Sequence, residues 1–392
     1  DVVKKMYEPE IRQDVINDSV IKKFYELVEQ QNLKPVSQPN LTPERLEIGK
    51  DIIFKATFEV YPEISLGSLS RLRYTKAVSS VTEKDVNKTV DKMTSIIDEA
   101  SRNGAQLVAF AETFIPAFPI WSAIRPPTEN HEFFKLLAQN SIYVNGPEIL
   151  AISEVAKKRK IMVSLGFNEL SRNSVGCIWN SNIIIGEDGK ILSHHRKITP
   201  TFYEKLVWAP GDGSGLKVRD TNIGKLGMLI CGENTNPLAR YSLLAQGEQV
   251  HISTYPPVWP THYPLTDTNY DLKSAIQIRA KGHSFEGKLF NLVCSAFLDK
   301  KTVDIVSANN IELASYLNEV PNGISMVTNP NGETISDILQ NEEGLLYCEI
   351  DISECVIPKQ YHDVVGGYQR FDIFELKVNN TAQNPVTFET HN

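Results

Sequence analysis

Short apolar runs alternate with amphipathic helical segments over much of this chain, and that alternation most constrains the fold. Apolar side chains recur every three or four residues over 82–103, and helix signals return over 147–160. Strand-length aliphatic runs stand beside these helices: AQLVAFAE (105–112), IMVSLGF (161–167), NSNIIIG (180–186), ILSHHRK (191–197) and KLGMLI (225–230). Helices that alternate with buried strands predict a layered α/β fold.

The first 93 residues differ in composition from the rest of the 392-residue chain. They hold 15 Lys and Arg and 15 Asp and Glu, so the formal net charge of −8 lies entirely in the later part. All four Trp and all five Cys also come later. We therefore predict two units, a small segment over residues 1–80 and a larger domain over 81–392.

The small segment shows signals for both a helix and a strand. Apolar residues at helical spacing predict one amphipathic helix between Ile11 and Val28, after Pro9. Residues 35–43 contain three prolines and predict a loop or extended connector. Residues 51–64 alternate apolar and polar side chains, as a half-exposed strand does. The segment is thus expected to be a small α+β unit.

Composition and charge argue against several classes of protein. The acidic balance, with a sequence pI near 5.6, does not favour a nucleic-acid binder. The most apolar stretch, residues 105–124, carries Glu112 and two prolines without a basic flank, so we expect a buried core segment and no membrane span. The first residues are charged and contain no apolar leader, so we expect no signal peptide and a cytoplasmic location.

No residue pattern indicates a metal or an organic cofactor. The five cysteines are scattered, odd in number and contain no C-x-x-C pair, which argues against a disulfide scaffold or a zinc ribbon. His194 and His195 are adjacent on a predicted strand, so their side chains should point to opposite faces and not share one ion. The sequence contains no G-x-G-x-x-G or Walker motif. We therefore expect no metal and no cofactor.

Three chemically reactive side chains stand at the ends of predicted strands. Glu112 and Lys197 each end an apolar run, and Cys231 follows another at a sharp turn. Because ligands and catalytic groups collect at strand ends in α/β sheets, these positions are candidates for one site. A thiol held at such a turn, near backbone N–H groups, is well placed to be a nucleophile. For any single cysteine the alternative is a small buried hydrophobe, which we expect of the other four.

The sequences around these three residues resemble the signature blocks of the nitrilase superfamily. They read AFAETFIPAFPIW around Glu112, SHHRKITPTFYEKLVWAPGDG around Lys197 and GMLICGENTNP around Cys231. The resemblance covers about residues 94–392, and its second block is closer to the nitrilase branch than to the amidase branches. It implies a four-layer α-β-β-α sandwich with a Glu-Lys-Cys triad, assembled as a homodimer or larger homo-oligomer.

The residue types also suit hydrolysis of a small-molecule nitrile to a carboxylic acid and ammonia. Cys231 would attack the nitrile carbon and carry thioimidate and thioester intermediates. Glu112 would transfer the protons, and Lys197 would stabilise the developing negative charge. The resemblance further implies that Glu204 positions substrate or water. The alternative for Glu204 is a surface glutamate paired with a nearby basic residue.

Other sequence features bear on the substrate pocket. Nitrilases usually carry Trp directly after the catalytic Cys, whereas Gly232 stands here and predicts a larger or looser pocket. The family's first strand, V-R-V-A-A-V-Q, corresponds to RLRYTKAVSSV (71–81), with Ser79 where the Gln would be. Five residues that follow the catalytic blocks are candidates for substrate binding: Phe118, Trp121, Thr201, Tyr255 and Trp259. A role as ordinary core residues explains them equally well.

Residues 1–93 resemble bacterial trigger factor, a ribosome-associated folding chaperone. The resemblance rests on YEPEIRQDVINDSVIKKFYELVEQQNLKPVSQPN, GKDIIFKATFEVYPEISLGSL and VTEKDVNKTVDKM. The family's ribosome-docking loop, G-F-R-x-G-x-x-P, is not found in this sequence, so the resemblance gives no basis for expecting ribosome binding. Three readings stay open: nitrile hydrolysis, amide hydrolysis on the same triad, and a chaperone fragment fused to an inactive hydrolase.

Overall fold

The structure, a computed structural model, describes residues 2–47, 49–61, 83–263, 268–308 and 310–386. The chain divides into two compact units, residues 1–78 and 79–392. The strand expected over 71–81 and Thr82, the expected N-cap of the next helix, lie outside the described residues.

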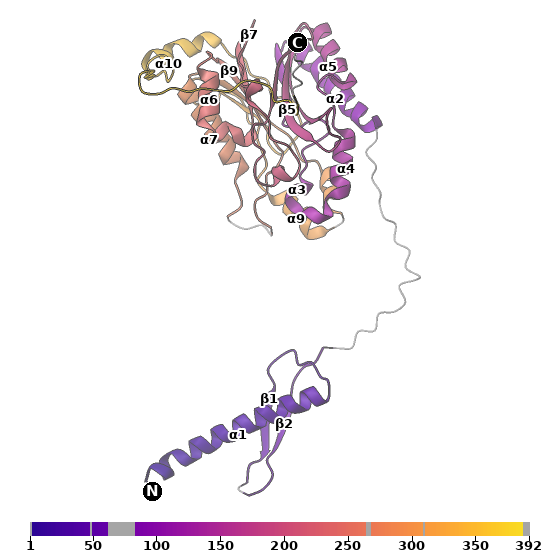
Figure 1. The fold of residues 1–392 in the computed structure, drawn as a ribbon, viewed down its shortest axis with the longest axis vertical. Coiled ribbons are helices and arrows are strands. Elements are labelled where there is room, and N and C mark those ends of the chain that lie inside the picture. The colour runs from indigo at the N-terminus through magenta and orange to yellow at the C-terminus, as the bar shows by residue number, and fades with distance from the viewer. Residues whose placement is uncertain (1, 48, 62–82, 264–267, 309, 387–392) are drawn as a thin grey trace, which may run out of the picture. The chain divides into compact units, whose positions relative to one another are not determined.

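The small unit contains one helix and one antiparallel pair of strands (Figure 1). Helix α1 (Val2–Gln30) buries Phe24, whose ring meets that of Phe58 edge to face at 5.1 Å. Strand β1 (Asn40–Arg45) pairs with β2 (Ile53–Thr57). The unit is thus α+β, as the sequence predicts.

Two boundaries in the small unit differ from the prediction. Helix α1 begins before Pro9, and Pro9 lies within it, although a helix starting after that residue was expected. The connector expected over 35–43 is partly strand, because β1 includes Pro43. An edge strand tolerates proline, because the missing N–H can fall on the side without a neighbouring strand. Both strands of this sheet are edge strands among the described residues.

The larger unit contains two β-sheets. The four-stranded sheet has the order β3-β4-β5-β6, with β3 (Leu107–Ala109), β4 (Met162–Leu170), β5 (Ile178–Ile185) and β6 (Ile191–Arg196). The five-stranded sheet has the order β11-β10-β9-β8-β7, with β7 (Arg219–Thr221), β8 (Gly224–Ile230), β9 (Val250–Tyr255), β10 (Phe290–Ser295) and β11 (Met326–Thr328). Strand β3 is parallel to β4, and β8, β9 and β10 are mutually parallel; the other neighbours are antiparallel.

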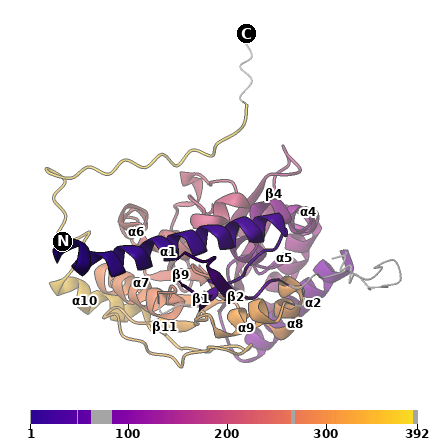
Figure 2. The same cartoon turned by 90° about the horizontal axis from the view of Figure 1, so that it is seen from below.

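Helices cover the outer faces of the two sheets. Helices α2 (Glu83–Arg102), α4 (His131–Asn140) and α5 (Pro147–Arg159) lie on one side, and α6 (Pro237–Leu244) and α7 (Leu272–Gly287) lie on the other (Figures 1 and 2). The remaining described α-helices are α3 (Trp121–Ile124), α8 (Lys300–Ser307), α9 (Ile311–Glu319) and α10 (Val356–Tyr361). The larger unit is therefore a four-layer α-β-β-α sandwich, as expected.

Apolar side chains fill the spaces between the layers. The predicted stripe of α2 packs with α5 on the four-stranded sheet through residues that include Met93, Ile97, Ile152 and Leu165. The two sheets meet through Met162, Ile184, Leu226, Met228, Val250 and Ile252. On the outer face of the five-stranded sheet, Leu229 packs with Leu243 of α6, and Val293 packs with Ile276 of α7. Burial of these side chains stabilises the stacked layers.

The apolar stretch over 105–124 is part of this core. Val108, Ile115 and Ile120 are buried within it. Among the described residues, no helix has the length and apolar character that crossing a bilayer requires.

Candidate active site

Glu112 lies just beyond β3, against strand β4. Strand β3 ends at Ala109, earlier than predicted, so Glu112 follows the strand at a distance of three residues. Gly166 of β4 allows the close approach, because a Cβ there would lie 2.4 Å from the carbonyl oxygen of Ala111. The Glu112 side chain is 1% exposed and accepts a hydrogen bond from Asn180 Nδ2 at 2.6 Å.

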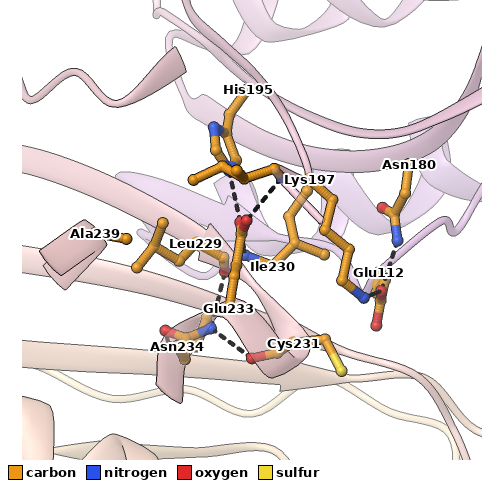
Figure 3. Close-up of polar contacts among 12 residues, drawn as sticks. Glu112, Asn180, His195, Lys197, Leu229, Ile230, Cys231, Glu233, Asn234 and Ala239 are labelled. Atoms are coloured by element: carbon orange, nitrogen blue, oxygen red, sulfur yellow. Dashed lines mark hydrogen bonds and ion pairs between the residues drawn. The ribbon is translucent and has the colours of Figure 1, made fainter. Parts of the chain in front are cut away.

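Lys197 follows β6 directly and points at Glu112 (Figure 3). Its Nζ donates to Glu112 Oε1 at 2.9 Å and to Glu204 Oε2 at 2.7 Å. The side chain is 1% exposed, and the Trp208 ring lies 5.7 Å from Nζ. One buried ammonium group therefore links two buried carboxylates.

Cys231 follows the last residue of β8 and begins a short 3₁₀ helix, η5 (Cys231–Thr235). Its φ of +50° lies in the left-handed region, which is unusual for a residue with a side chain. The Cys231 Sγ and one carboxylate oxygen from each of Glu112 and Glu204 lie within 4.8 Å of one another. The structure thus brings together all four residues that were predicted to be catalytic.

Glu204 belongs to the 3₁₀ helix η3 (Phe202–Leu206) and is fully buried. Its Oε2 accepts a hydrogen bond from the backbone N–H of Thr201 at 2.7 Å, and its Oε1 accepts one from Trp259 Nε1 at 3.2 Å. The alternative of a surface glutamate is therefore wrong. The sequence could not exclude it, because the apolar residues on both sides of Glu204 follow no regular helix or strand period.

The charges in this site shift the proton affinities of its members. Burial, reinforced by Glu204 and opposed by Lys197, raises the pKa of Glu112 to about 7. Burial also raises the pKa of the Cys231 thiol well above its usual value. The negative charge of Glu112 adds to this rise, and the positive charge of Lys197 opposes it. For Lys197 burial favours the neutral form, but the two carboxylates outweigh it and hold its pKa well above the ordinary value. The arrangement supplies a neutral thiol beside a carboxylate that can take its proton near neutral pH.

Glu233 ties the Lys197 segment to the Cys231 turn. Its Oε1 accepts from the backbone N–H of Ile230 at 2.7 Å, and its Oε2 accepts from that of Ile198 at 3.0 Å (Figure 3). His195 Nε2 meets the same Oε1 at 2.5 Å. One carboxylate thereby fixes the residue before the cysteine relative to the residue after the lysine. The sequence pattern does not predict this role for Glu233, whose only signal is its place two residues after Cys231.

Three of the predicted substrate-binding residues lie beside the catalytic groups. Thr201 donates its backbone N–H to Glu204, and Trp259 donates its indole N–H to the same side chain. Tyr255 is fully buried and belongs to the same apolar cluster as Cys231. These positions are consistent with lining a substrate site.

The other two predicted substrate-binding residues are farther from the catalytic groups. Phe118 packs edge to face on Trp208 with ring centroids 5.6 Å apart, and the Trp208 ring in turn lies 5.7 Å from Lys197 Nζ. Trp121 stacks on Phe133 at 5.8 Å. Both are 8% exposed members of an apolar cluster, which favours the alternative of core aromatics for Trp121.

Two groups of potential metal ligands occur among the described residues. In the first, Glu112, Glu204 and Cys231, the ammonium group of Lys197 already contacts both carboxylates. The second group comprises Glu248, His251 and His283, all fully buried. His194 and His195, considered above as a metal pair, bond to two different carboxylates, those of Glu169 and Glu233.

Comparison with known proteins agrees with this geometry. The family described as carbon–nitrogen hydrolase matches residues 75–356, which is well over half of the chain. This chain belongs to the carbon–nitrogen hydrolase family. A second family, described as bacterial trigger factor protein, matches residues 1–93. This agrees with the resemblance seen in the sequence of that segment.

Individual relatives of this carbon–nitrogen hydrolase cover most of the larger unit. A nitrilase of Paraburkholderia phymatum is 32% identical over 76% of this chain and 84% of its own length. A nitrilase of Penicillium rubens is 33% identical over 78% of this chain and 92% of its own length. The crystal structure of a carbon–nitrogen hydrolase from Helicobacter pylori shares the fold, with a TM-score of 0.57 and 21% identity over 73% of this chain and 91% of that one. The protein is thus a hydrolase that acts on carbon–nitrogen bonds.

Proposed function

We propose that this hydrolase converts an organic nitrile and two water molecules to a carboxylic acid and ammonia through covalent intermediates on Cys231. The observation that carries the proposal is the convergence of one thiol, two carboxylates and one ammonium group in a buried site. The relatives that are 32% and 33% identical to this chain and named nitrilases support it.

The first half of the proposed reaction forms a thioimidate. Glu112 takes the proton of the Cys231 thiol while Sγ bonds to the nitrile carbon and one carbon–nitrogen π bond opens. The nitrogen receives that proton from Glu112, which gives a C=NH group. A carboxyl pKa near 7 lets one residue accept and return protons at neutral pH.

The second half releases ammonia and then the acid. Water adds to the thioimidate carbon, with its proton passing through Glu112 to nitrogen. The tetrahedral species expels ammonia and leaves a thioester on Cys231. A second water molecule hydrolyses the thioester and restores the thiol. Lys197 donates hydrogen bonds to the negative charge that develops in each tetrahedral species, and Glu204 holds the lysine in place.

Mass spectrometry of the intact chain tests this proposal. The chain is incubated with a panel of aliphatic and aryl nitriles, and ammonia is assayed in the same tubes. We expect an adduct that maps to Cys231 together with ammonia release, and neither in Cys231→Ala, whose fold is checked by circular dichroism. Ammonia from the matching amides but not from the nitriles would replace nitrile hydrolysis with amide hydrolysis. If the folded chain gives neither an adduct nor ammonia, the hydrolase is inactive.

We also infer a domain boundary near residue 80 and assembly of the hydrolase unit as at least a homodimer. The division of the chain at residues 78 and 79 supports the boundary, and the family resemblance supports the oligomer. Limited proteolysis should cut near residue 80, and light scattering should give a mass of at least twice 44.0 kDa. Co-sedimentation of the full chain with ribosomes would revive the chaperone alternative.

A further inference from the structure

A row of buried polar side chains leads from Glu248 to the backbone of Cys231. Glu248 Oε1 lies 2.6 Å from His251 Nδ1, and His251 Nε2 lies 2.9 Å from Asn234 Oδ1. Asn234 Nδ2 donates to the carbonyl oxygens of Cys231 at 3.1 Å and Leu229 at 3.2 Å (Figure 3). The row therefore ends on the turn that presents the thiol.

The hydrogen-bond directions in this row follow from the acceptors at its end. Because the two carbonyl oxygens can only accept, Asn234 must turn its NH₂ group toward them and its Oδ1 toward His251. His251 Nε2 must then carry a hydrogen. Its Nδ1 lies next to the Glu248 carboxyl group, so the imidazole bridges Glu248 and Asn234.

The surroundings hold the row in one arrangement. Glu248 and His251 are fully buried and Asn234 is 1% exposed. Ser253 Oγ lies between two side-chain oxygens, at 3.2 Å from Asn234 Oδ1 and 2.8 Å from Asn291 Oδ1. Gly227 of β8 leaves room for the carboxylate, because a Cβ there would lie 1.9 Å from Glu248 Oε1. Both Nδ2 and Oδ1 of Asn234 are hydrogen-bonded, so this amide has little freedom to turn.

The row acts on a backbone conformation that is unfavourable by itself. Cys231 has a φ of +50°, and a residue with a side chain adopts this only when its surroundings enforce it. Asn234 donates hydrogen bonds to the carbonyl oxygen of Cys231 and to that of Leu229, which stands two residues before Cys231. These bonds hold the turn from both sides of the strained residue.

We propose that His251 and Asn234 are positioning residues that hold the Cys231 turn in its reactive conformation, with the Glu248 side chain holding the His251 ring in place. The inference rests on the proposed role of Cys231 as nucleophile. Neither His251 nor Asn234 touches the substrate in this proposal, and both act through the backbone of the cysteine turn.

His283 provides a matched control for His251. It is equally buried, its ring lies 4.2 Å from the His251 ring, and its Nε2 lies 3.5 Å from Glu248 Oε2. No hydrogen bond links it to Asn234 in the described part of the chain. Replacing either histidine by Leu removes a buried imidazole, but only His251→Leu frees Asn234.

Two readouts test the proposal on the full chain. The first is kcat and KM with the best nitrile. The second is the rate at which iodoacetamide alkylates Cys231, followed by peptide mass spectrometry, with the partly exposed Cys348 as an internal reference. We expect His251→Leu and Asn234→Leu to lower kcat and the alkylation rate about tenfold or more, with KM changed less than about threefold. His283→Leu should change both by less than about twofold, and His251→Gln, which keeps an N–H donor near Nε2, should recover part of the loss.

Several outcomes would overturn the proposal. One is an equal loss in His283→Leu and His251→Leu, because the effect would then be general destabilisation. Another is an unchanged alkylation rate in His251→Leu. A third is one equivalent of bound metal that both histidine variants lose, since the cluster would then be a metal site. If the wild type is alkylated at Cys231 but hydrolyses no nitrile, the proposed function fails while the alkylation comparison still decides the positioning role.

Discussion

Lys197 and Glu112 form an ion pair with 2.9 Å between Nζ and Oε1, and both residues are buried. They stand 85 residues apart in the sequence. Glu204 pairs with the same ammonium group at 2.7 Å, so two carboxylates share one cation. Burial raises the pKa of Glu112 to about 7, Lys197 opposes this rise, and Glu204 adds to it. The pH dependence and the stability of the site both follow from this relationship.

The raised pKa of Glu112 predicts a rise in activity through neutral pH. A general base must be deprotonated, so kcat/KM should increase with pH and level off above an apparent pKa near 7. Iodoacetamide alkylation of Cys231 should show the same inflection, because the carboxylate accepts the thiol proton. In Glu112→Gln the inflection near 7 should vanish. An inflection that persists in this variant would assign it to another group.

The same shift predicts the sign of a stability change. Folded Glu112 keeps its proton up to about pH 7, whereas the unfolded residue releases it near 4.5. The folded state therefore binds more protons between these values, and the contribution of Glu112 is full below pH 4.5 and declines as the pH rises to 7. Urea unfolding of Glu112→Gln, compared with the wild type across this range, measures that contribution. A contribution that grows with pH would contradict the assignment.

Replacing Lys197 by Met should destabilise the larger unit strongly. The change leaves Glu112 and Glu204 buried without their cation, which typically costs about 3–5 kcal/mol. All four Trp lie after residue 93, so tryptophan fluorescence in urea follows the larger unit. The loss should be smaller at pH 5, where a carboxyl group without its cation is protonated.

Lys190→Met is the matched control for Lys197. Its ion pair with Asp188 is solvent-exposed, with the two side chains 82% and 51% exposed. We expect no measurable change in the urea midpoint of unfolding. Equal losses in the two variants would contradict a special role for the buried pair.

Trp259→Phe should lower activity while preserving the fold. The substitution removes the N–H that donates to Glu204 Oε1 but keeps a ring that can stack on Tyr203. Hydrogen bonds to charged groups contribute about 1.5–3 kcal/mol, so we expect kcat/KM to fall roughly tenfold or more. Trp179→Phe is the control, because the Trp179 ring lies under Arg196, away from Glu204. Similar losses in both variants would refute a specific role for the indole N–H.

Gly232→Ala tests the space beside the nucleophile. A Cβ at this position would lie 2.8 Å from Thr201 Oγ1, and Thr201 caps the helix that carries Glu204. We expect kcat/KM to fall about tenfold through displacement of that helix. The double variant with Thr201→Ala should lose less than the two single losses combined, since the steric conflict is then gone. Additive losses would show that Gly232 and Thr201 act independently.

Much of the fold could be predicted from local patterns. The stripe of Val90, Met93, Ile97 and Ala100 marks the buried face of α2, and the aliphatic runs mark β4, β5, β6 and β8. Such patterns are legible because burial of a helix or strand face imposes a period on its own sequence. The end of β3 and the extent of α1 were misplaced, since strand pairing and helix ends depend on partners elsewhere in the chain.

The sequence by itself singled out Glu112, Lys197 and Cys231 as candidates for the chemistry, because each follows a strand and each has a distinctive reactive group. Only the tertiary structure decided how those groups are held. It placed Glu204 inside, joined Glu233 to the segments on both sides of the site, and aligned Asn234 with His251. These partners come from different strands and turns of the stacked sheets, and a hydrogen bond between distant segments leaves no periodic trace in either of them.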